Sequence, residues 1–161
     1  IDRSDTTLTG FSGRLRLDFD RSNVVAPDHD RHVTNALERG SLEANGLTGS
    51  LALDVDRSDN IALEGVEGSL QLDADRSNVT MTATRLSDDS VVAIDRGDLD
   101  LGLIERQPLT IEADLSQRAD FTSDLPLTLQ GNGEEFTGLL NGGGPILHVT
   151  ADRSTIRLRS R

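Results

Sequence analysis

The sequence has no cysteine, tryptophan, tyrosine or lysine, and only four of its 161 residues are phenylalanine. Without cysteine the fold has neither a disulfide framework nor thiolate metal ligands. Because aromatic residues make up 2% of the chain, the core has to be built from Leu, Val, Ile and Ala, whose small side chains suit a narrow interior. No apolar run approaches the roughly 18 residues that span a bilayer, and no segment resembles the apolar part of a signal peptide.

The chain is strongly acidic, with 28 Asp and Glu residues against 16 Arg residues and a formal net charge of −12. Nucleic acids and anionic lipids bind clustered cations, so we expect no nucleic-acid partner, and membrane contact only through an anchor outside this chain. The chain opens at Ile1 rather than Met, which fits a processed extracytoplasmic precursor. Its length predicts a single domain over residues 1–161.

An acid-Arg-small tripeptide recurs along the sequence. Its first six arginines follow each other at steps of roughly 18 to 20 residues, and the interval from the sixth to the seventh equals three further steps of this size. This period predicts two further registers in which the motif has decayed, near Leu115 and Glu134. The seven copies are Asp2-Arg3-Ser4, Asp20-Arg21-Ser22, Glu38-Arg39-Gly40, Asp56-Arg57-Ser58, Asp75-Arg76-Ser77, Asp95-Arg96-Gly97 and Asp152-Arg153-Ser154.

Within a unit, apolar and polar residues alternate. Leu70, Leu72 and Ala74 precede one tripeptide, and Val79 and Met81 follow it with the opposite parity. A period of two predicts β-strands, and the short polar residues between the two runs predict a turn. A second corner begins with glycine, as in the segment 65–68. Each unit is therefore predicted to contain two short strands and two corners.

Two strands per unit fit either a stack of coils or a meander of hairpins in a sandwich or barrel. Hairpins tolerate irregular spacing, whereas a near-constant spacing of one corner motif favours units that lie directly over each other. We therefore predict an all-β fold, a single-stranded, right-handed β-helix-like solenoid with coils of about 18 to 20 residues. Leu53, Leu72 and Ile94 are expected to point inward, and Gly131-Asn132-Gly133 and Gly142-Gly143-Gly144 to form turns of a capping excursion.

The Gly-x-Leu-x-Leu strands, the small-Asp/Asn-aliphatic corners and the ending Gly142-Gly143-Gly144-Pro145-Ile146-Leu147-His148-Val149-Thr150 resemble a known family. They are similar to the bacterial adhesin-like family catalogued as domain of unknown function 4097. Gly97-Asp98-Leu99 matches its Ser-Gly-Asp-Ile corner most nearly, while most corners here carry Arg-Ser instead. The resemblance implies a bacterial, β-helical domain outside the cytoplasm, periplasmic or on the cell surface, and carries over no catalytic residues.

Stacking at a fixed period would turn sequence positions into surface columns. Asp2, Asp20, Glu38, Asp56, Asp75 and Asp95, with Asp114 as a further candidate, would form an acidic column beside the tripeptide arginines, and Asp18, Asp54 and Asp73 would form another two residues upstream. One interpretation is a self-neutralising structural ladder. The other is divalent-cation binding between successive carboxylates, although the Gly-rich calcium nonapeptide is absent. We expect the paired ladder, exposed and without metal.

The segment from Pro27 to His32 concentrates two of the three histidines with two aspartates. Asp28, His29, Asp30 and His32 are candidate ligands for a transition metal, because imidazole and carboxylate suit such ions. A mobile polar loop between coils explains the same residues without chemistry, and we expect that loop with no metal and no cofactor.

No nucleophile elbow, phosphate-binding loop or histidine-based triad is present, and aromatic platforms for sugars are scarce. We therefore expect a protein that is not an enzyme, an extracytoplasmic binding or adhesion-like module whose partner is a protein or a glycan. One alternative is a ligand-sensing or spacer domain of a membrane-anchored signalling protein. A second is a polysaccharide-acting β-helix enzyme, which would need a cleft with converging carboxylates. The sequence leaves the oligomeric state open.

Overall fold

The protein is all-β. A computed structural model describes residues 5–7, 15–20, 23–30, 33–58 and 60–160, with side chains at 34, 36–58 and 60–160. These residues form sixteen strands and no helix. Accordingly, the described part of the chain holds no helix long and apolar enough to cross a membrane.

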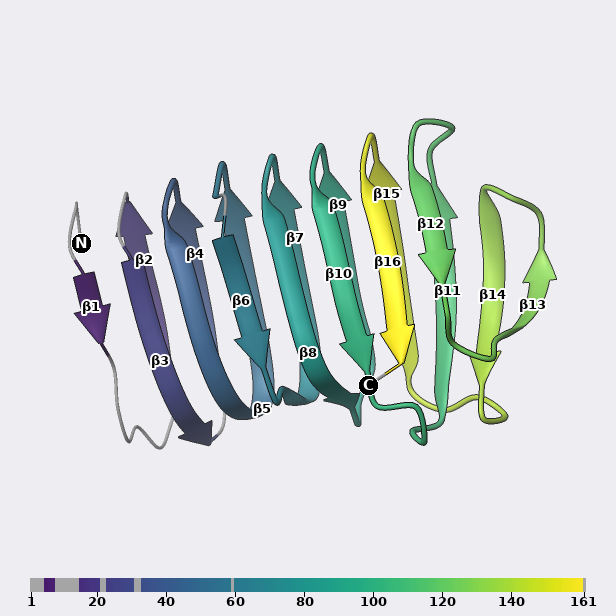
Figure 1. Cartoon of the computed structure of the whole chain (residues 1–161), viewed down its shortest axis with the longest axis horizontal. Helices are drawn as coiled ribbons and strands as arrows, with labels where there is room; N and C mark the ends of the chain where they lie inside the picture. Colours follow the sequence, from purple (N-terminus) through teal and green to yellow (C-terminus); the bar gives the residue numbers. More distant parts are fainter. Residues whose placement is uncertain (1–4, 8–14, 21–22, 31–32, 59, 161) are drawn as a thin grey trace.

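The strands lie in two rows that face each other (Figure 1). The front row contains β1 (Asp5–Thr7), β3 (Asn23–Asp30), the first part of β5 (Ser41–Asp56), β6 (Asn60–Glu64), β8 (Asn78–Leu86), β10 (Asp98–Leu103), β16 (Thr155–Ser160) and β12 (Asp120–Ser123). The back row contains β2 (Leu15–Asp20), β4 (Val33–Glu38), the second part of β5, β7 (Glu67–Asp75), β9 (Ser90–Asp95), β15 (Ile146–Asp152), β11 (Leu109–Leu115), β14 (Glu135–Leu140) and β13 (Thr128–Gly131).

Up to β10, each strand pairs in parallel with the strand one unit later in the sequence. Leu53 lies beside Leu72, and Leu72 beside Val92, so the offsets follow the repeat. Because β5 and β8 continue around a corner, β5, β6, β8 and β7 also form a closed ring of parallel pairs. The Gly corner needs glycine, since a Cβ on Gly68 would lie 1.8 Å from the carbonyl oxygen of Gly49.

The C-terminal unit breaks the correspondence between sequence order and stacking order. β15 pairs with β9 on one side and with β11 on the other, and β16 lies in the same way between β10 and β12. Arg153 is therefore one step from Arg96 in the stack, and the expectation of three successive steps between them is wrong. Between these two arginines the chain first forms β11 to β14, and it then returns to place β15 between β9 and β11 and β16 between β10 and β12.

Of the two registers expected to have decayed, one exists. Leu115 ends β11 beside Ala151, and Ser116 donates its backbone N–H to the Ala151 carbonyl at 2.9 Å, as a corner of the stack does. Glu134 is not a corner of a stacked unit. It precedes β14, which runs antiparallel to β11 and forms a hairpin with β13. The Gly-rich segments accordingly lie in turns at the two ends of β14, at the capping end of the stack.

In the acid-Arg-small turns, every arginine that the structure describes has a left-handed backbone conformation, with φ between 49° and 56°. This conformation costs a non-glycine residue about 1–2 kcal/mol. Hydrogen bonds to the next turn offset that cost. The Arg57 N–H donates to the Asp75 carbonyl at 2.9 Å, and the Ser58 N–H donates to the buried Oγ of Ser77 at 3.0 Å. The turns therefore stack through backbone and serine side chains.

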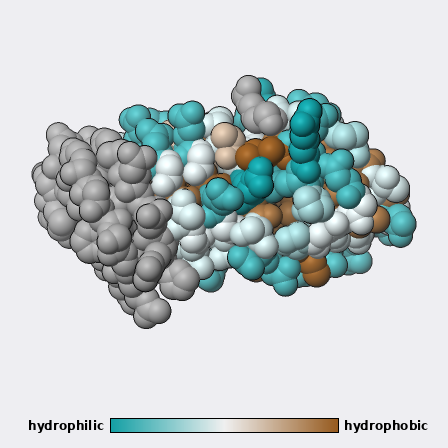
Figure 2. Space-filling view, turned by 90° about the horizontal axis from the view of Figure 1, so that it is seen from below, coloured by the Kyte–Doolittle hydropathy of each residue, from teal (hydrophilic) through white to brown (hydrophobic). Residues whose placement is uncertain are grey.

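The core fills the space between the rows with aliphatic residues. The expected inward residues Leu53, Leu72 and Ile94 are each at most 3% exposed. One column of neighbours runs through Leu42, Ile61, Val79, Leu99 and Ile156, so the inserted unit continues the same core. Outside, hydrophilic side chains predominate on the face seen in Figure 2.

Candidate functional site

Among the described side chains the ladder predicted from the tripeptides is present, with one change in membership; Asp2 and the side chain of Asp20 lie outside what the structure describes. In the stack the acidic column runs through Glu38, Asp56, Asp75, Asp95 and Asp152. Asp114 is not part of it, because the insertion of β15 places Asp152 next to Asp95 and sets Asp114 beside Thr150. The upstream column pairs Asp54 with Asp73, as expected, but Ala36 separates Asp18 from Asp54.

Each ladder carboxylate contacts an arginine of its own turn, and some also contact one from the next turn. The Glu38 carboxylate lies 3.2 Å from Arg39 and 3.4 Å from Arg57, and that of Asp75 lies 3.2 Å from Arg96. These side chains are about one-third to one-half exposed, so the expectation of an exposed and mutually paired ladder is confirmed.

Two charged residues near the C-terminal end of the ladder have shifted pKa values. A hydrogen bond from the Ser116 hydroxyl at 2.6 Å, helped by Arg153 and Arg118, lowers the pKa of Asp152 below its ordinary value. The pKa of Arg96 is raised, first by its hydrogen bonds to Asp95 and then by the charge of Asp75. Both shifts favour the charged forms, which fits a ladder whose role is structural.

The histidine-aspartate segment is placed only in part. Asp28, His29 and Asp30 belong to strand β3, where His29 lies beside Leu47 and Asp30 beside Thr48, so the expected loop is wrong for these residues. The long strand β5 provides a neighbour along this whole stretch, which keeps it extended. His32 lies outside the described residues. Within the part of the chain that the structure describes, no three His, Asp or Glu side chains are grouped as metal ligands.

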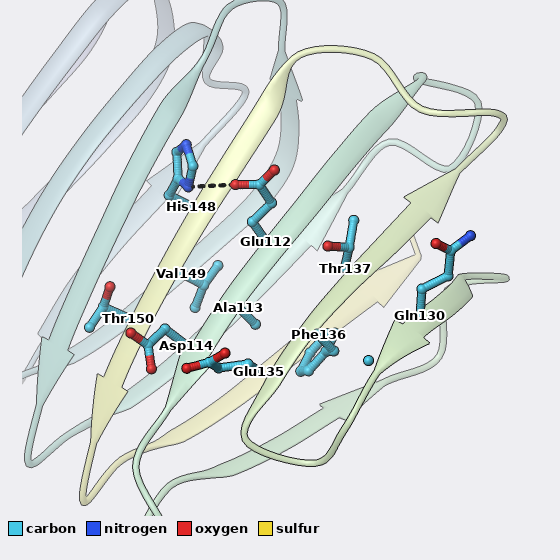
Figure 3. Close-up of a pocket in the computed structure, with 11 residues that line it drawn as sticks. Glu112, Ala113, Asp114, Gln130, Glu135, Phe136, Thr137, His148, Val149 and Thr150 are labelled. Atoms are coloured by element: carbon cyan, nitrogen blue, oxygen red, sulfur yellow. Dashed lines mark ion pairs between the residues drawn. The ribbon is translucent and has the colours of Figure 1, made fainter.

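A groove that the sequence did not indicate lies at the capping end, over β15, β11, β14 and β13. Its volume is about 520 Å³ (Figure 3). It is lined by residues from four neighbouring strands: Glu112, Ala113, Asp114, Gln130, Gly131, Glu135, Phe136, Thr137, His148, Val149 and Thr150. The polar members are brought together by register, because His148 is beside Glu112, Glu112 beside Thr137, and Thr137 beside Gln130.

The groove holds three carboxylates and no arginine. One of them, Glu112, is partnered by His148, whose Nδ1 lies 3.1 Å from the Glu112 Oε2. The other two, Asp114 and Glu135, are direct neighbours on the antiparallel strands β11 and β14 and lie side by side in Figure 3. Like charges placed opposite each other destabilise a sheet. The arrangement therefore favours a ligand that brings positive charge or hydrogen-bond donors.

Sequence reasoning missed Glu112, Glu135 and His148, and placed Asp114 in the wrong column. One signal was present. The Gly131-Asn132-Gly133 turn is flanked by alternating residues, which is a hairpin pattern, and a hairpin would have set Glu135 on the same face as Thr137. That β14 then pairs with β11 was not readable from the sequence, because no motif links the two strands.

The groove offers carboxylate, imidazole, amide and hydroxyl groups on one rigid sheet face, while the ladder carboxylates are paired with arginine. The groove is therefore the better candidate for a binding site. No protein-family model matches the sequence, and comparisons with curated proteins and with solved structures find no match.

Proposed function

We propose that this protein is a non-enzymatic, extracytoplasmic binding module and that the groove over β15, β11, β14 and β13 is its contact surface. The observation that carries the proposal is the set of three carboxylates gathered in a hollow that no arginine lines. The neighbouring pair Asp114 and Glu135 gains most from a bound cation, because the two charges otherwise repel each other.

The partner we propose is a protein with exposed basic residues. Arginine and lysine side chains complement paired carboxylates, and electrostatic complementarity raises both specificity and association rate. A glycan partner is less well supported, because Phe136 is the one aromatic residue among those that line the groove.

We also propose that the fold is a single-stranded β-solenoid with coils of about 18 to 20 residues. The support is the parallel pairing of strands one unit apart and the stacked turns, in which the Arg57 N–H reaches the Asp75 carbonyl and the Arg76 N–H reaches the Asp95 carbonyl. The likeness of its corners to the bacterial adhesin-like family supports the proposed location outside the cytoplasm.

The test compares basic, neutral and acidic synthetic peptides and a glycan array against the chain and two double variants. Asp114→Asn with Glu135→Gln removes the charges of the groove. Asp54→Asn with Asp73→Asn is the matched control, because it removes two neighbouring carboxylates from the same row outside the groove. We expect basic peptides to bind and the groove variant to bind them at least about tenfold more weakly, with the control unchanged. Equal effects of both variants would refute the groove as the contact surface.

A second candidate function, cleavage of a polysaccharide, is favoured by the adjacency of Asp114 and Glu135. Glycoside hydrolysis uses a pair of carboxyl groups that flank the bond. Its test is turnover of acidic and neutral polysaccharides by the pure chain. Turnover that is abolished by Glu135→Gln and retained in Asp73→Asn would replace the non-enzymatic proposal.

A further inference from the structure

The two rows of strands end at different places. The front row ends at β12, which pairs with β16 on one side and with no described strand on the other. The back row continues past that point with β14 and β13 (Figure 1). The inner side of these last strands therefore extends beyond the end of the front row and is not covered by a facing strand of it.

A cleft of about 380 Å³ lies between β12 and this overhang. Phe121 of β12 and Phe136 of β14 meet there edge to face, with ring centroids 4.8 Å apart. Leu129 of β13 also lines the cleft and is 61% exposed, although every apolar side chain of the central core is buried. The cleft thus joins an apolar surface to an open strand edge.

The backbone of β12 has hydrogen-bonding groups on its open side. The N–H of Asp120 donates to the carbonyl of Ser154, just before β16, at 2.8 Å, and that of Asp124 donates to the carbonyl of Leu158 in β16 at 3.1 Å. Because alternate residues of a parallel strand bond to the same neighbour, the N–H groups of Phe121 and Ser123 point to the side away from β16. An added parallel strand would bond to them.

The strand that already pairs with β12 shows what chemistry this edge accepts. β16 alternates apolar and basic residues, with Ile156 and Leu158 buried in the core and Arg157 and Arg159 on the outside. Its arginines reach diagonally across to aspartates on β10. Arg157 lies beside Asp100 but contacts Asp98 at 3.9 Å, and Arg159 contacts Asp100 at 2.8 Å.

Asp120 repeats this arrangement one strand further along. Asp98, Thr155 and Asp120 are neighbours across β10, β16 and β12, so Asp120 has the same place on β12 that Asp98 has on β10. An arginine beside Thr122 on an added strand would reach the Asp120 carboxylate by the same diagonal. That carboxylate is in none of the ion pairs formed between described residues, whereas Asp98 already has Arg157.

We propose that the open edge of β12 and the adjoining cleft accept an extended strand from a partner protein, in which apolar residues alternate with arginine or lysine. The strand lies parallel to β12, places its apolar side chains in the cleft against Phe121, Phe136 and Leu129, and presents a cation to Asp120. This is strand addition to a sheet edge, in which main-chain hydrogen bonds give affinity and side-chain alternation gives specificity. The proposal does not depend on the function of the outer groove.

The probe is a capped, fluorescently labelled peptide with the sequence of β16, Thr-Ile-Arg-Leu-Arg-Ser, titrated into the full chain. We expect saturable binding that Asp120→Arg weakens by roughly tenfold or more and that Asp73→Arg, the same charge change on the flat back row, leaves within about twofold. The peptide Thr-Ile-Glu-Leu-Glu-Ser is expected to bind at least about tenfold more weakly. Equal binding of both peptides, or equal effects of both variants, would overturn the proposal.

Two controls need no change at the β12 edge. A probe peptide that is N-methylated at every residue loses its main-chain donors, so it should not bind; if it does, strand addition is wrong. Asp95→Cys with Asp152→Cys joins two neighbouring residues of β9 and β15 outside the groove and so fixes the C-terminal unit between its neighbouring strands. Binding should survive the lock. Its loss would mean that the peptide replaces β16 itself, and competition with dimerisation of the chain would mean that the occupant is a second copy; either result overturns the proposal.

Discussion

From β5 to β10 each unit stacks on the unit before it in the sequence, and its turn acids contact turn arginines. Beyond β10 the stacking order departs from the sequence order, an antiparallel hairpin ends the back row, and the outer face carries Asp114 and Glu135 without arginine. The comparison teaches that regular repetition here sets each acid of a turn beside an arginine. The groove and the open edge arise where repetition stops.

The largest effect is expected where the inserted unit joins the core. Leu147 is fully buried between Ser90 and Ile111, so Leu147→Ala should lower the free energy of unfolding by about 2–5 kcal/mol. Leu129→Ala, at the exposed capping edge, should change it by less than about 0.5 kcal/mol. Urea denaturation measures both. If Leu147→Ala costs no more than Leu129→Ala, the C-terminal unit is not an integral part of the stack.

The next effect concerns the serines of the turns. The buried Ser77 hydroxyl donates to the Asp75 carbonyl at 2.8 Å and accepts from the Ser58 N–H. Ser77→Ala leaves that N–H without its partner and should cost about 1–3 kcal/mol. Ser87→Ala, at an exposed loop serine bonded to Asp88, should be nearly neutral in the same thermal unfolding experiment. Similar losses in both variants would contradict a stacking role for the turn serine.

A smaller difference in stability distinguishes the contribution of the turn conformation from that of the ion pairs. Arg96→Ala removes the contacts with Asp75 and Asp95 and keeps a side chain at φ 56°, whereas Arg96→Gly removes both the contacts and the strain. We expect the glycine variant to be more stable than the alanine variant by about 1 kcal/mol, because alanine keeps the strain of the left-handed conformation. The lost ion pairs, which contribute about 0–1 kcal/mol, lower the stability of both variants alike. Chemical denaturation decides this, and an alanine variant that equals or exceeds the glycine variant would show that the turn is not strained.

The smallest effect is a pH dependence at the last rung. The Ser116 hydroxyl, the largest cause, lowers the pKa of Asp152, so this rung adds stability above the ordinary aspartate pKa and loses it as the pH falls through the lowered value. Ser116→Ala should raise the pKa of Asp152 toward its ordinary value. Side-chain carboxyl NMR titration measures the change, and an unchanged titration would show that Ser116 does not lower the pKa of Asp152.

Alternation and the arginine register predicted much of the central stack. Leu53 and Leu72 are buried neighbours because a period of two and the period of the tripeptide place them on the same face of successive units. The same register could not reveal the inserted unit. The interval between Arg96 and Arg153 is equally compatible with three successive units and with one unit reached by a return path, and only tertiary pairing distinguishes them.

The site was less predictable than the core for a related reason. Glu112 and Asp114 become groove residues through pairing with β14 and β15, which lie far away in the sequence. The acid-Arg turns, by contrast, contain their own partners locally and were predicted as a ladder. Motifs within one segment report local structure, whereas a site assembled from four strands depends on contacts that no single segment encodes.

The position of β15 and β16 between earlier strands also determines when the molecule is complete. A chain that emerges from the ribosome or a translocation channel with its N-terminus first can add units up to β10 as they appear. Until residues 146–160 arrive, β11 can pair only with β14, and β12 has none of its described neighbours, since residues 146–160 form the layer that joins both strands to the stack. A product that stops before this segment would lack a middle layer rather than an end, and quality control would meet an exposed interior instead of a shorter but intact protein.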